Sequence, residues 1–229
     1  MKILSIDTSS KICTVAVLED TKLLKEISKD NGLTHSETLM PIIKGIFESL
    51  DLSLSDIDLI VCDKGPGSFT GIRIGIATAK GFQDSLNINT VGISSLETLV
   101  YNCHEDGIIC SMIDAKNLNA YYAVFEKKLD KYILIKTFSV DTIDNILSEL
   151  LVFSSSITFV GDGAIAYENE IKQKFSDCKF VSNNDLSSYN LGLAGLSHFN
   201  NNECDDILPL YLRKPQAERM LEEKLSNGK

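Results

Sequence analysis

The chain has 229 residues, of which 44% are hydrophobic, and it carries a formal net charge of −10 with a pI of about 4.8. This composition predicts a folded globular protein and argues against direct binding of nucleic acid, because phosphate contacts need clustered Lys and Arg. The six cysteines form no CxxC pair, and the sequence has no run of about 18 apolar residues. We therefore expect a cytoplasmic protein with reduced cysteines and no membrane segment.

The first fifty residues predict three strands followed by a helix. Apolar runs at residues 2–6, 12–18 and 23–28 are typical of strands, and the first two form a hairpin. Thr34 and Glu37 have the spacing of a capping box, which predicts the start of a helix. The apolar residues of this helix share one broad face: Leu39, Ile42, Ile43, Ile46, Phe47 and Leu50.

The rest of the chain is organised around residues 59–86. This stretch predicts a buried strand, a Gly-Pro-Gly turn at residues 65–67 and a helix in which Gly71, Gly75 and Ala79 recur every fourth residue. Apolar side chains point to two sides of this helix: Ile74 and Phe82 to one, and Ile72, Ile76 and Leu86 to the other. Two interpretations stay open. The helix packs on a sheet and against another helix or chain, or it is simply central to its own domain.

A repeat links the two halves of the sequence. Residues 3–19 and 110–126 share an Ile-Asp pair, a gap of equal length and an Ala-Val-x-Glu ending, so Asp7 corresponds to Asp114. The repeat predicts two strand–turn–strand units from a duplicated domain. The alternative is a chance likeness, because hairpin patterns are degenerate.

The remaining sequence predicts alternating strands and helices. Further strands are expected at residues 89–91, 132–140 and 157–160, and helices at 94–102, 142–151, after Gly163 to about Phe175, and 186–202. The end of the chain predicts a charged helix with one apolar face, made of Ala217, Met220, Leu221 and Leu225.

Candidate binding residues lie at the hairpin corners. The first corner is Asp7, Thr8, Ser9 and Ser10, where short hydroxyls and turn amides could hold a phosphate. The second corner is Asp114, Ala115, Lys116 and Asn117, and Asp162 lies in a further turn between two glycines. Both corners are weak candidates for cofactor binding, because the same residues favour structural turns.

Other catalytic chemistry has little support in the sequence. His35, His104 and His198 have no partner at metal-ligand spacing, so no metal site is predicted. No serine lies in a GxSxG elbow, and no cysteine and histidine pair by spacing. No catalytic residue is therefore predicted.

Several motifs resemble the TsaB family, the bacterial tRNA threonylcarbamoyladenosine biosynthesis proteins. The signature is Gly65–Arg73, GPGSFTGIR, with further likeness at residues 6–9, 34–41, 113–115 and 208–213. The resemblance implies an α/β fold of the actin/hexokinase-like (ASKHA) class, in which each half is a mixed sheet flanked by helices. The expected halves are residues 1–105, with the partner-binding helices, and 106–229, whose terminal helix can pack back on the first.

The resemblance also implies a function. The chain would be a non-catalytic subunit of the complex that adds a threonylcarbamoyl group to adenosine 37 of tRNAs reading codons that begin with A. It would bind and stabilise a TsaD-like catalytic subunit, together with a TsaE-like ATPase, and would contact tRNA only through the complex. The sister family TsaD carries a metal-binding His-x-x-x-His where this chain has Ser95 and Leu99. Nucleotide and metal are therefore expected on the partner subunits, and no cofactor on this one.

The same resemblance places the partner interface, and a homodimer contact, on the two helices that begin near residues 34 and 69. The expected contacts are Leu39, Ile42, Ile43, Ile46, Ile72 and Ile76, with Arg73 and Lys80 at the rim. An Ile76→Glu change is then expected to leave a folded monomer that no longer binds its partner. Two rival functions remain: an ATPase or kinase of the same fold, and a metallopeptidase.

Overall fold

The computed structural model describes residues 1–30, 32, 34–153, 155–203 and 207–214, which form two five-stranded sheets with helices around them. The first half contains β1 (Lys2–Asp7), β2 (Cys13–Glu19), β3 (Lys22–Lys29), α1 (His35–Leu50), the short 3-10 helix η1 (Leu54–Asp56), β4 (Leu59–Asp63), α2 (Phe69–Leu86), β5 (Asn89–Ile93) and α3 (Ser95–Val100). The second contains β6 (Gly107–Asp114), β7 (Asn119–Lys128), β8 (Lys131–Thr142), α4 (Ile143–Leu150), β9 (Ile157–Val160), α5 (Asp162–Ala166), α6 (Glu168–Lys174), β10 (Cys178–Phe180) and α7 (Ser188–Asn200).

The two sheets have the same topology. The first has the order β3-β2-β1-β4-β5 and the second has the equivalent order β8-β7-β6-β9-β10. In each sheet the first strand pairs antiparallel with the second and parallel with the fourth. Asp7 ends β1 and Asp114 ends β6, so the repeat seen in the sequence marks equivalent corners. The predicted duplication is confirmed.

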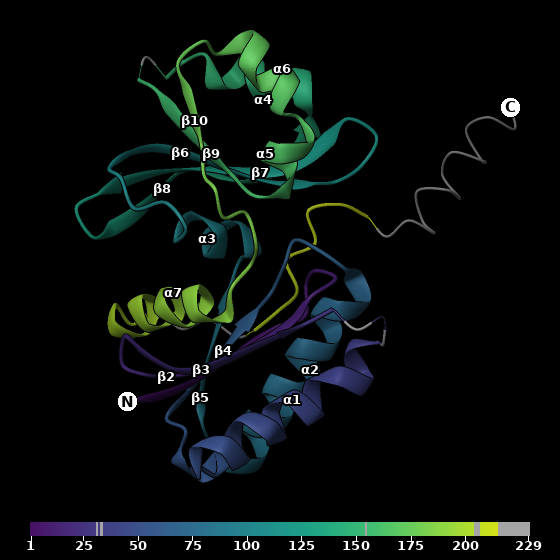
Figure 1. Cartoon of the computed structure of the whole chain (residues 1–229), viewed down its shortest axis with the longest axis vertical. Coiled ribbons are helices and arrows are strands. Elements are labelled where there is room, and N and C mark those ends of the chain that lie inside the picture. The colour runs from purple at the N-terminus through teal and green to yellow at the C-terminus, as the bar shows by residue number, and fades with distance from the viewer. Residues whose placement is uncertain (31, 33, 154, 204–206, 215–229) are drawn as a thin grey trace, which may run out of the picture.

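The elements form layers (Figure 1). Helices α1 and α2 cover one face of the first sheet and α7 covers the other, while α4, α5 and α6 cover the outer face of the second sheet. Helix α3 packs on the inner face of the second sheet and against α7, so these two helices lie between the sheets. Both sheets are covered on both faces, which explains why their central strands are continuous apolar runs.

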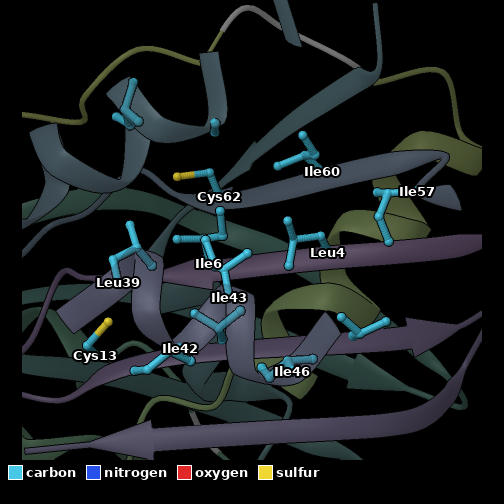
Figure 2. Packing of buried hydrophobic residues seen from close by; sticks show 14 of the residues in the cluster. Leu4, Ile6, Cys13, Leu39, Ile42, Ile43, Ile46, Ile57, Ile60 and Cys62 are labelled. Carbon is cyan, nitrogen blue, oxygen red and sulfur yellow. The ribbon is translucent and has the colours of Figure 1, made fainter. Parts of the chain in front are cut away.

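In the core beneath α1 and α2, every second residue of the strands packs against the apolar face of α1. Figure 2 shows Leu4 and Ile6 of β1 beside Ile60 and Cys62 of β4, facing the helix. The opposite face of β1 presents Ile3 to a second cluster, which α7 covers. Successive residues of β1 therefore face opposite sides of the sheet, as expected for a strand.

Helix α7 belongs to the second half in sequence but packs on the first sheet. Its first residue, Ser188, accepts a hydrogen bond at its carbonyl from Ser5 Oγ at 2.5 Å, and its hydroxyl lies 2.5 Å from Thr14 Oγ1. A Cβ on Gly195 would come within 2.4 Å of the methyl groups of Val61, so glycine allows close packing of helix on sheet. The predicted ranges 1–105 and 106–229 each hold one sheet, but α7 covers the first sheet from the second range.

Most predicted elements lie within a few residues of the observed ones, including the capping box of Thr34 and Glu37 on α1. Two predictions differ. The helix expected up to Phe175 is broken at Tyr167 into α5 and α6, and β10 was not predicted because it has only three residues. The charged terminal helix predicted around Met220 lies outside the described residues. Among those described, no helix is long and apolar enough to cross a membrane.

The α3–α7 contact contains a titratable pair. His198 Nε2 lies 2.6 Å from Glu97 Oε1, and its Nδ1 lies 3.3 Å from Glu203 Oε2. The hydrogen bond to Glu97, aided by the charges of both glutamates, raises the pKa of His198 above its usual value although burial opposes this. The folded state therefore binds this proton more tightly than the unfolded state does.

We expect this pair to make stability depend on pH. Its contribution is fully present below the unfolded histidine pKa and is lost as pH rises through the higher folded pKa. His198→Gln should lower the free energy of unfolding by about 1 kcal/mol at pH values below the unfolded histidine pKa, and by little at pH values above the folded pKa. Urea denaturation across the window measures this, with His104→Gln on the surface as the control. Equal losses at both ends of the pH range would contradict a charged pair.

Candidate functional site

The GPGSFTG signature fits closely against the corner of the first hairpin. Ser68 N donates to Ser9 O at 2.7 Å, and Thr8 Oγ1 donates to Gly71 O at 2.7 Å. Ser68 also caps α2, since its hydroxyl accepts from Gly71 N at 3.2 Å. From α1, His35 Nε2 lies 2.8 Å from Ser10 O. Helices α1 and α2 are therefore fastened to the same corner.

The glycines of the signature are explained by this fit. A Cβ on Gly67 would lie 2.3 Å from Ser9 O, one on Gly71 only 1.9 Å from Thr8 O, and one on Gly75 2.6 Å from Thr8 Oγ1. No Cβ tolerates such distances, so the row of small residues faces the chain's own first strand. The predicted packing of this helix on a sheet is confirmed, and its row of small residues is what allows the close approach.

Gly81, later in the same helix, has no such neighbour. A Cβ added there would meet nothing within 4 Å, and the same holds for Gly45 of α1. We expect Gly81→Ala to stabilise the fold by about 1 kcal/mol, since alanine is the better helix former. Gly71→Ala should instead lower stability by about 1–3 kcal/mol through overpacking. Chemical denaturation of both variants checks this, and a gain for Gly71→Ala would contradict the close fit.

Two buried carboxyl groups lie beneath the corner, at the ends of the adjacent parallel strands β1 and β4. Asp7 Oδ1 accepts from Ser9 N at 2.7 Å, and Asp63 Oδ1 accepts from Gly65 N at 2.6 Å and from Ser95 Oγ at 2.7 Å. Their Oδ2 atoms are buried without a hydrogen-bond donor. A proton held between the two groups would satisfy such oxygens, because a protonated carboxyl donates.

The surroundings of Asp7 and Asp63 favour the protonated form of the pair. Burial raises the pKa of Asp7, against the opposing effects of its hydrogen bonds from Ser9 and the charge of His35. Burial together with the charge of Asp7 raises the pKa of Asp63 well above its usual value. Desolvation and a like charge both disfavour ionisation, so the neutral form of the pair is favoured to higher pH than for a free aspartate.

The first corner is filled by the chain itself. Asp7, Thr8 and Ser9 are at most 3% exposed, and Ser10 is turned to Ile12, whose N–H donates to its hydroxyl. A phosphate could not reach these groups without moving α2 and the Gly-Pro-Gly turn away. In the described part of the chain, no three His, Cys, Asp or Glu side chains are placed to hold a metal ion.

Ser95 and Leu99, which the resemblance aligned with the histidines of TsaD, have packing roles here. Ser95 is fully buried, and its hydroxyl donates to Asp63 and lies 3.3 Å from Ser9 Oγ. Leu99 is 1% exposed within the cluster between α3 and the second sheet. Neither residue is presented to a cleft.

The second corner is more open. Lys116 Nζ pairs with Asp114, which also accepts from Tyr167 OH at 2.9 Å. Burial alone would raise the pKa of Asp114, but these donors outweigh it and lower the pKa. Asp162 Oδ1 accepts from Asp114 N at 3.0 Å, while burial raises its own pKa. Two carboxylates bordering one lysine make this corner unsuited to a phosphate.

The C-terminal segment 207–214 connects both halves. Tyr211 stacks on Phe69 with ring centroids 4.9 Å apart, and Arg73 Nε donates to Tyr211 OH at 2.7 Å. Arg213 then reaches the second half, donating to Ala115 O at 2.9 Å. Arg73, predicted at the rim of the partner interface, therefore also binds Tyr211 within the chain, a contact that the sequence did not predict.

The predicted interface residues need correction. Leu39, Ile42, Ile43, Ile46, Ile72 and Ile76 are all between 0 and 6% exposed. They form the core between α1, α2 and the first sheet, because both helices use their main apolar face to cover the sheet. Figure 2 labels Leu39, Ile42, Ile43 and Ile46 in this core. Apart from Ile43, which also lines an open groove along α1, the predicted residues are not available to a partner. Arg73 is exposed and Lys80 half-buried.

A second, outward face of α2 remains. Ile74, Ala77, Thr78 and Gly81 follow the i, i+3, i+4, i+7 spacing of one helix face, here named the outer stripe. Ala77 and Gly81 are exposed, Ile74 and Thr78 half-buried, and none carries a charge. On the same side of the sheet an open groove along α1 is lined by the apolar residues Met40, Ile43, Phe47, Leu52 and Leu54 and by Lys44, Glu48, Asp51 and Ser53. Among the described residues, the uncharged outer stripe together with this mixed groove is the best candidate for binding a partner.

Comparison with known proteins identifies the class. Residues 29–219 match the family described as "TsaD: tRNA N6-adenosine threonylcarbamoyltransferase". Among solved structures, a Pseudomonas aeruginosa protein described as similar to the peptidase YeaZ superposes with a TM-score of 0.79, at 24% identity over 93% of this chain and 99% of that one. An activator of 2-hydroxyisocaproyl-CoA dehydratase from Clostridium difficile, with bound ADPNP, has a TM-score of 0.51 at 9% identity, over 89% and 97%. The predicted α/β, actin/hexokinase-like fold is confirmed, and the chain is a TsaD-related protein of that fold.

Curated relatives narrow the assignment. The protein named tRNA threonylcarbamoyladenosine biosynthesis protein TsaB from Buchnera aphidicola (Schizaphis graminum) is 31% identical over 186 residues, which cover 78% of this chain and 87% of that protein. Its namesake in Bacillus subtilis is 37% identical over 129 residues, and the match spans about half of either chain, 56%. This chain belongs to the TsaB family, as the GPGSFTG signature predicted.

Proposed function

We propose that this chain takes part in threonylcarbamoyladenosine biosynthesis on tRNA as a non-catalytic subunit. The relatives named TsaB support the pathway. The observation that carries the non-catalytic role is the first corner, where the signature motif is used to fasten helices rather than to present reactive groups. Ser95 and Leu99 support it as well, because both are buried packing residues.

The proposed partner is a TsaD-like catalytic subunit that packs on the outer stripe of α2. Gly81 supports this, since glycine destabilises a helix and, apart from its chain neighbours and its own helix backbone, no atom lies within 4 Å of the position that its Cβ would take. A small uncharged stripe allows a partner helix to approach closely, and Lys80 borders it. A stable interface would bury on the order of 800 Å² on each partner, which needs the stripe together with the α1 groove. The resemblance adds a TsaE-like ATPase to this complex.

Nucleoside mass spectrometry of bulk tRNA tests the proposal. Depletion of this chain should lower threonylcarbamoyladenosine while unmodified adenosine accumulates at the same position, and the natural chain should restore it. Ala77→Glu should fail to restore it, whereas Leu129→Glu, a matched change at an exposed apolar residue of the second half, should restore it. Full modification after depletion would contradict the proposed role in threonylcarbamoyladenosine biosynthesis. Rescue by Ala77→Glu would contradict the proposal that the partner binds the outer stripe.

A further inference from the structure

The terminal segment, residues 215–229, has a sequence feature that the proposed function does not use. It lies outside the described part of the chain, and its sequence predicts a helix, with Pro215 suited to the first turn and Gly228 to the position just past the end. One face of that helix is apolar: Ala217, Met220, Leu221 and Leu225. A helix this short is marginal in water by itself, so it forms when its apolar face packs on a surface.

The described chain ends beside the first turns of α2. Its last residues, yellow in Figure 1, include Tyr211, which stacks on Phe69 and accepts a hydrogen bond from Arg73. Lys214 follows three residues later, which is at most about 10 Å of chain. The terminal segment therefore starts within reach of the outer stripe, whose first member, Ile74, directly follows Arg73.

The outer stripe matches this predicted helix in length and in shape. From Ile74 to Gly81 it extends about 10 Å along α2, and the apolar face of the terminal segment extends about 12 Å. The stripe carries no charge and is partly exposed along its whole length. Gly81 has no side chain to hold a neighbour away, and small residues at a contact let two helix axes approach closely.

We propose that the terminal segment packs on the outer stripe as a helix parallel to α2. The parallel direction follows from the connection, because the segment starts at the N-terminal end of α2. Three apolar residues of the segment then meet three residues of the stripe: Ala217 beside Ile74, Leu221 beside Thr78 and Leu225 over Gly81. The segment gains a surface for its apolar face, and the stripe gains a cover.

The charges favour the same direction. On α2, Arg73 and Lys80 border the outer stripe on one side. On the terminal segment, at 100° per residue, Glu218 and Glu222 border the apolar face on one side. In a parallel pair of helices these two borders fall on the same side of the contact, whereas an antiparallel segment turns its glutamates to the opposite side. Opposite charges therefore meet only in the parallel arrangement, with Glu222 near Lys80.

This packing makes the terminal segment an autoinhibitory cover, an inference that rests on the proposed function. The TsaD-like subunit has to displace the segment before it binds the outer stripe. The apparent affinity of such a partner falls in proportion to the fraction of chains whose binding surface is open. A stripe covered in about nine chains out of ten lowers that affinity about tenfold.

Crosslinking within the full chain tests the packing without any partner. Gly81→Cys combined with Leu225→Cys places two cysteines at facing positions, and mild oxidation should join them within one chain. Gly81→Cys combined with Ala217→Cys is the matched control, because a parallel helix separates these positions by about 10 Å, more than a disulfide spans. Mass mapping of the peptides identifies the bond. Preferential crosslinking of the control pair, crosslinking of neither pair, or a bond found only between two chains would overturn the proposal.

Binding of a TsaD-like subunit to the full chain tests the competition. Leu221→Glu should release the terminal segment and strengthen binding about tenfold. Leu129→Glu, at an exposed apolar residue of the second half, should leave the affinity unchanged. Weaker or unchanged binding by Leu221→Glu would overturn the autoinhibition. The crosslink depends neither on the partner nor on tRNA modification, so the packing of the segment and the proposed function can fail separately.

Discussion

Replacing Ile76 by glutamate is expected to destabilise the chain severely, while the same change at the next residue leaves its stability nearly unchanged. Ile76 is 6% exposed in the core beneath α2, and Ala77 lies on the outer stripe. A buried carboxylate without a partner costs about 3–5 kcal/mol, a large share of the 5–15 kcal/mol by which most proteins are stable. Thermal and urea denaturation of Ile76→Glu and Ala77→Glu measure the difference.

This expectation replaces the one drawn from the sequence, that Ile76→Glu would leave a folded monomer. Ile76→Val serves as the conservative control and should cost only about 0.5–1.5 kcal/mol. Binding of a TsaD-like subunit is measured on the same proteins, where Ala77→Glu should fold normally and bind weakly. An Ile76→Glu chain as stable as Ala77→Glu would show that α2 does not pack on the sheet as described.

Asp63→Asn is expected to stabilise the chain, an unusual result for a fully buried residue. Asparagine keeps an oxygen for the N–H of Gly65 and the hydroxyl of Ser95, and its amide can donate to the unpartnered oxygen of Asp7. Satisfying a buried polar atom and removing a buried charge together should add about 1–3 kcal/mol near neutral pH. Urea denaturation at several pH values measures the gain.

The pH dependence identifies the cause. Because burial raises the folded pKa of Asp63, the folded state holds its proton to higher pH than the unfolded state does. The contribution of Asp63 to stability is therefore fully present below the ordinary aspartate pKa and is lost as pH rises through its higher folded pKa. Asp63→Asn should flatten this decline, and Asp130→Asn, exposed before β8, should not. Identical slopes for the natural chain and Asp63→Asn would exclude a proton held between the carboxyl groups.

The duplicated fold could be read from the sequence because its signals are local. The Asp7 and Asp114 corners, the capping box on α1 and the apolar periods each depend on residues close in the chain. The family signature at residues 65–73 added the fold class. Short elements gave weaker signals, so β10 was missed and the break at Tyr167 was not foreseen.

The site was harder to predict, because burial depends on residues far apart. Spacing alone showed that α1 and α2 have wide apolar faces, but not that Ile72 and Ile76 face the sheet while Ala77 faces outward. The proximity of Asp63 to Asp7 requires parallel strands 56 residues apart in sequence to be adjacent. An acidic residue at the end of a buried strand was the available signal for Asp63.

Helix α7 has a consequence for how the chain is made. Residues 188–200 cover one face of the first sheet, so that apolar face stays exposed to solvent until α7 itself has left the ribosome. Contacts of such long sequence separation slow folding and favour a single cooperative transition. A fragment that stops after α3 should accordingly need chaperones or aggregate, and supplying α7 in trans as a peptide should rescue it.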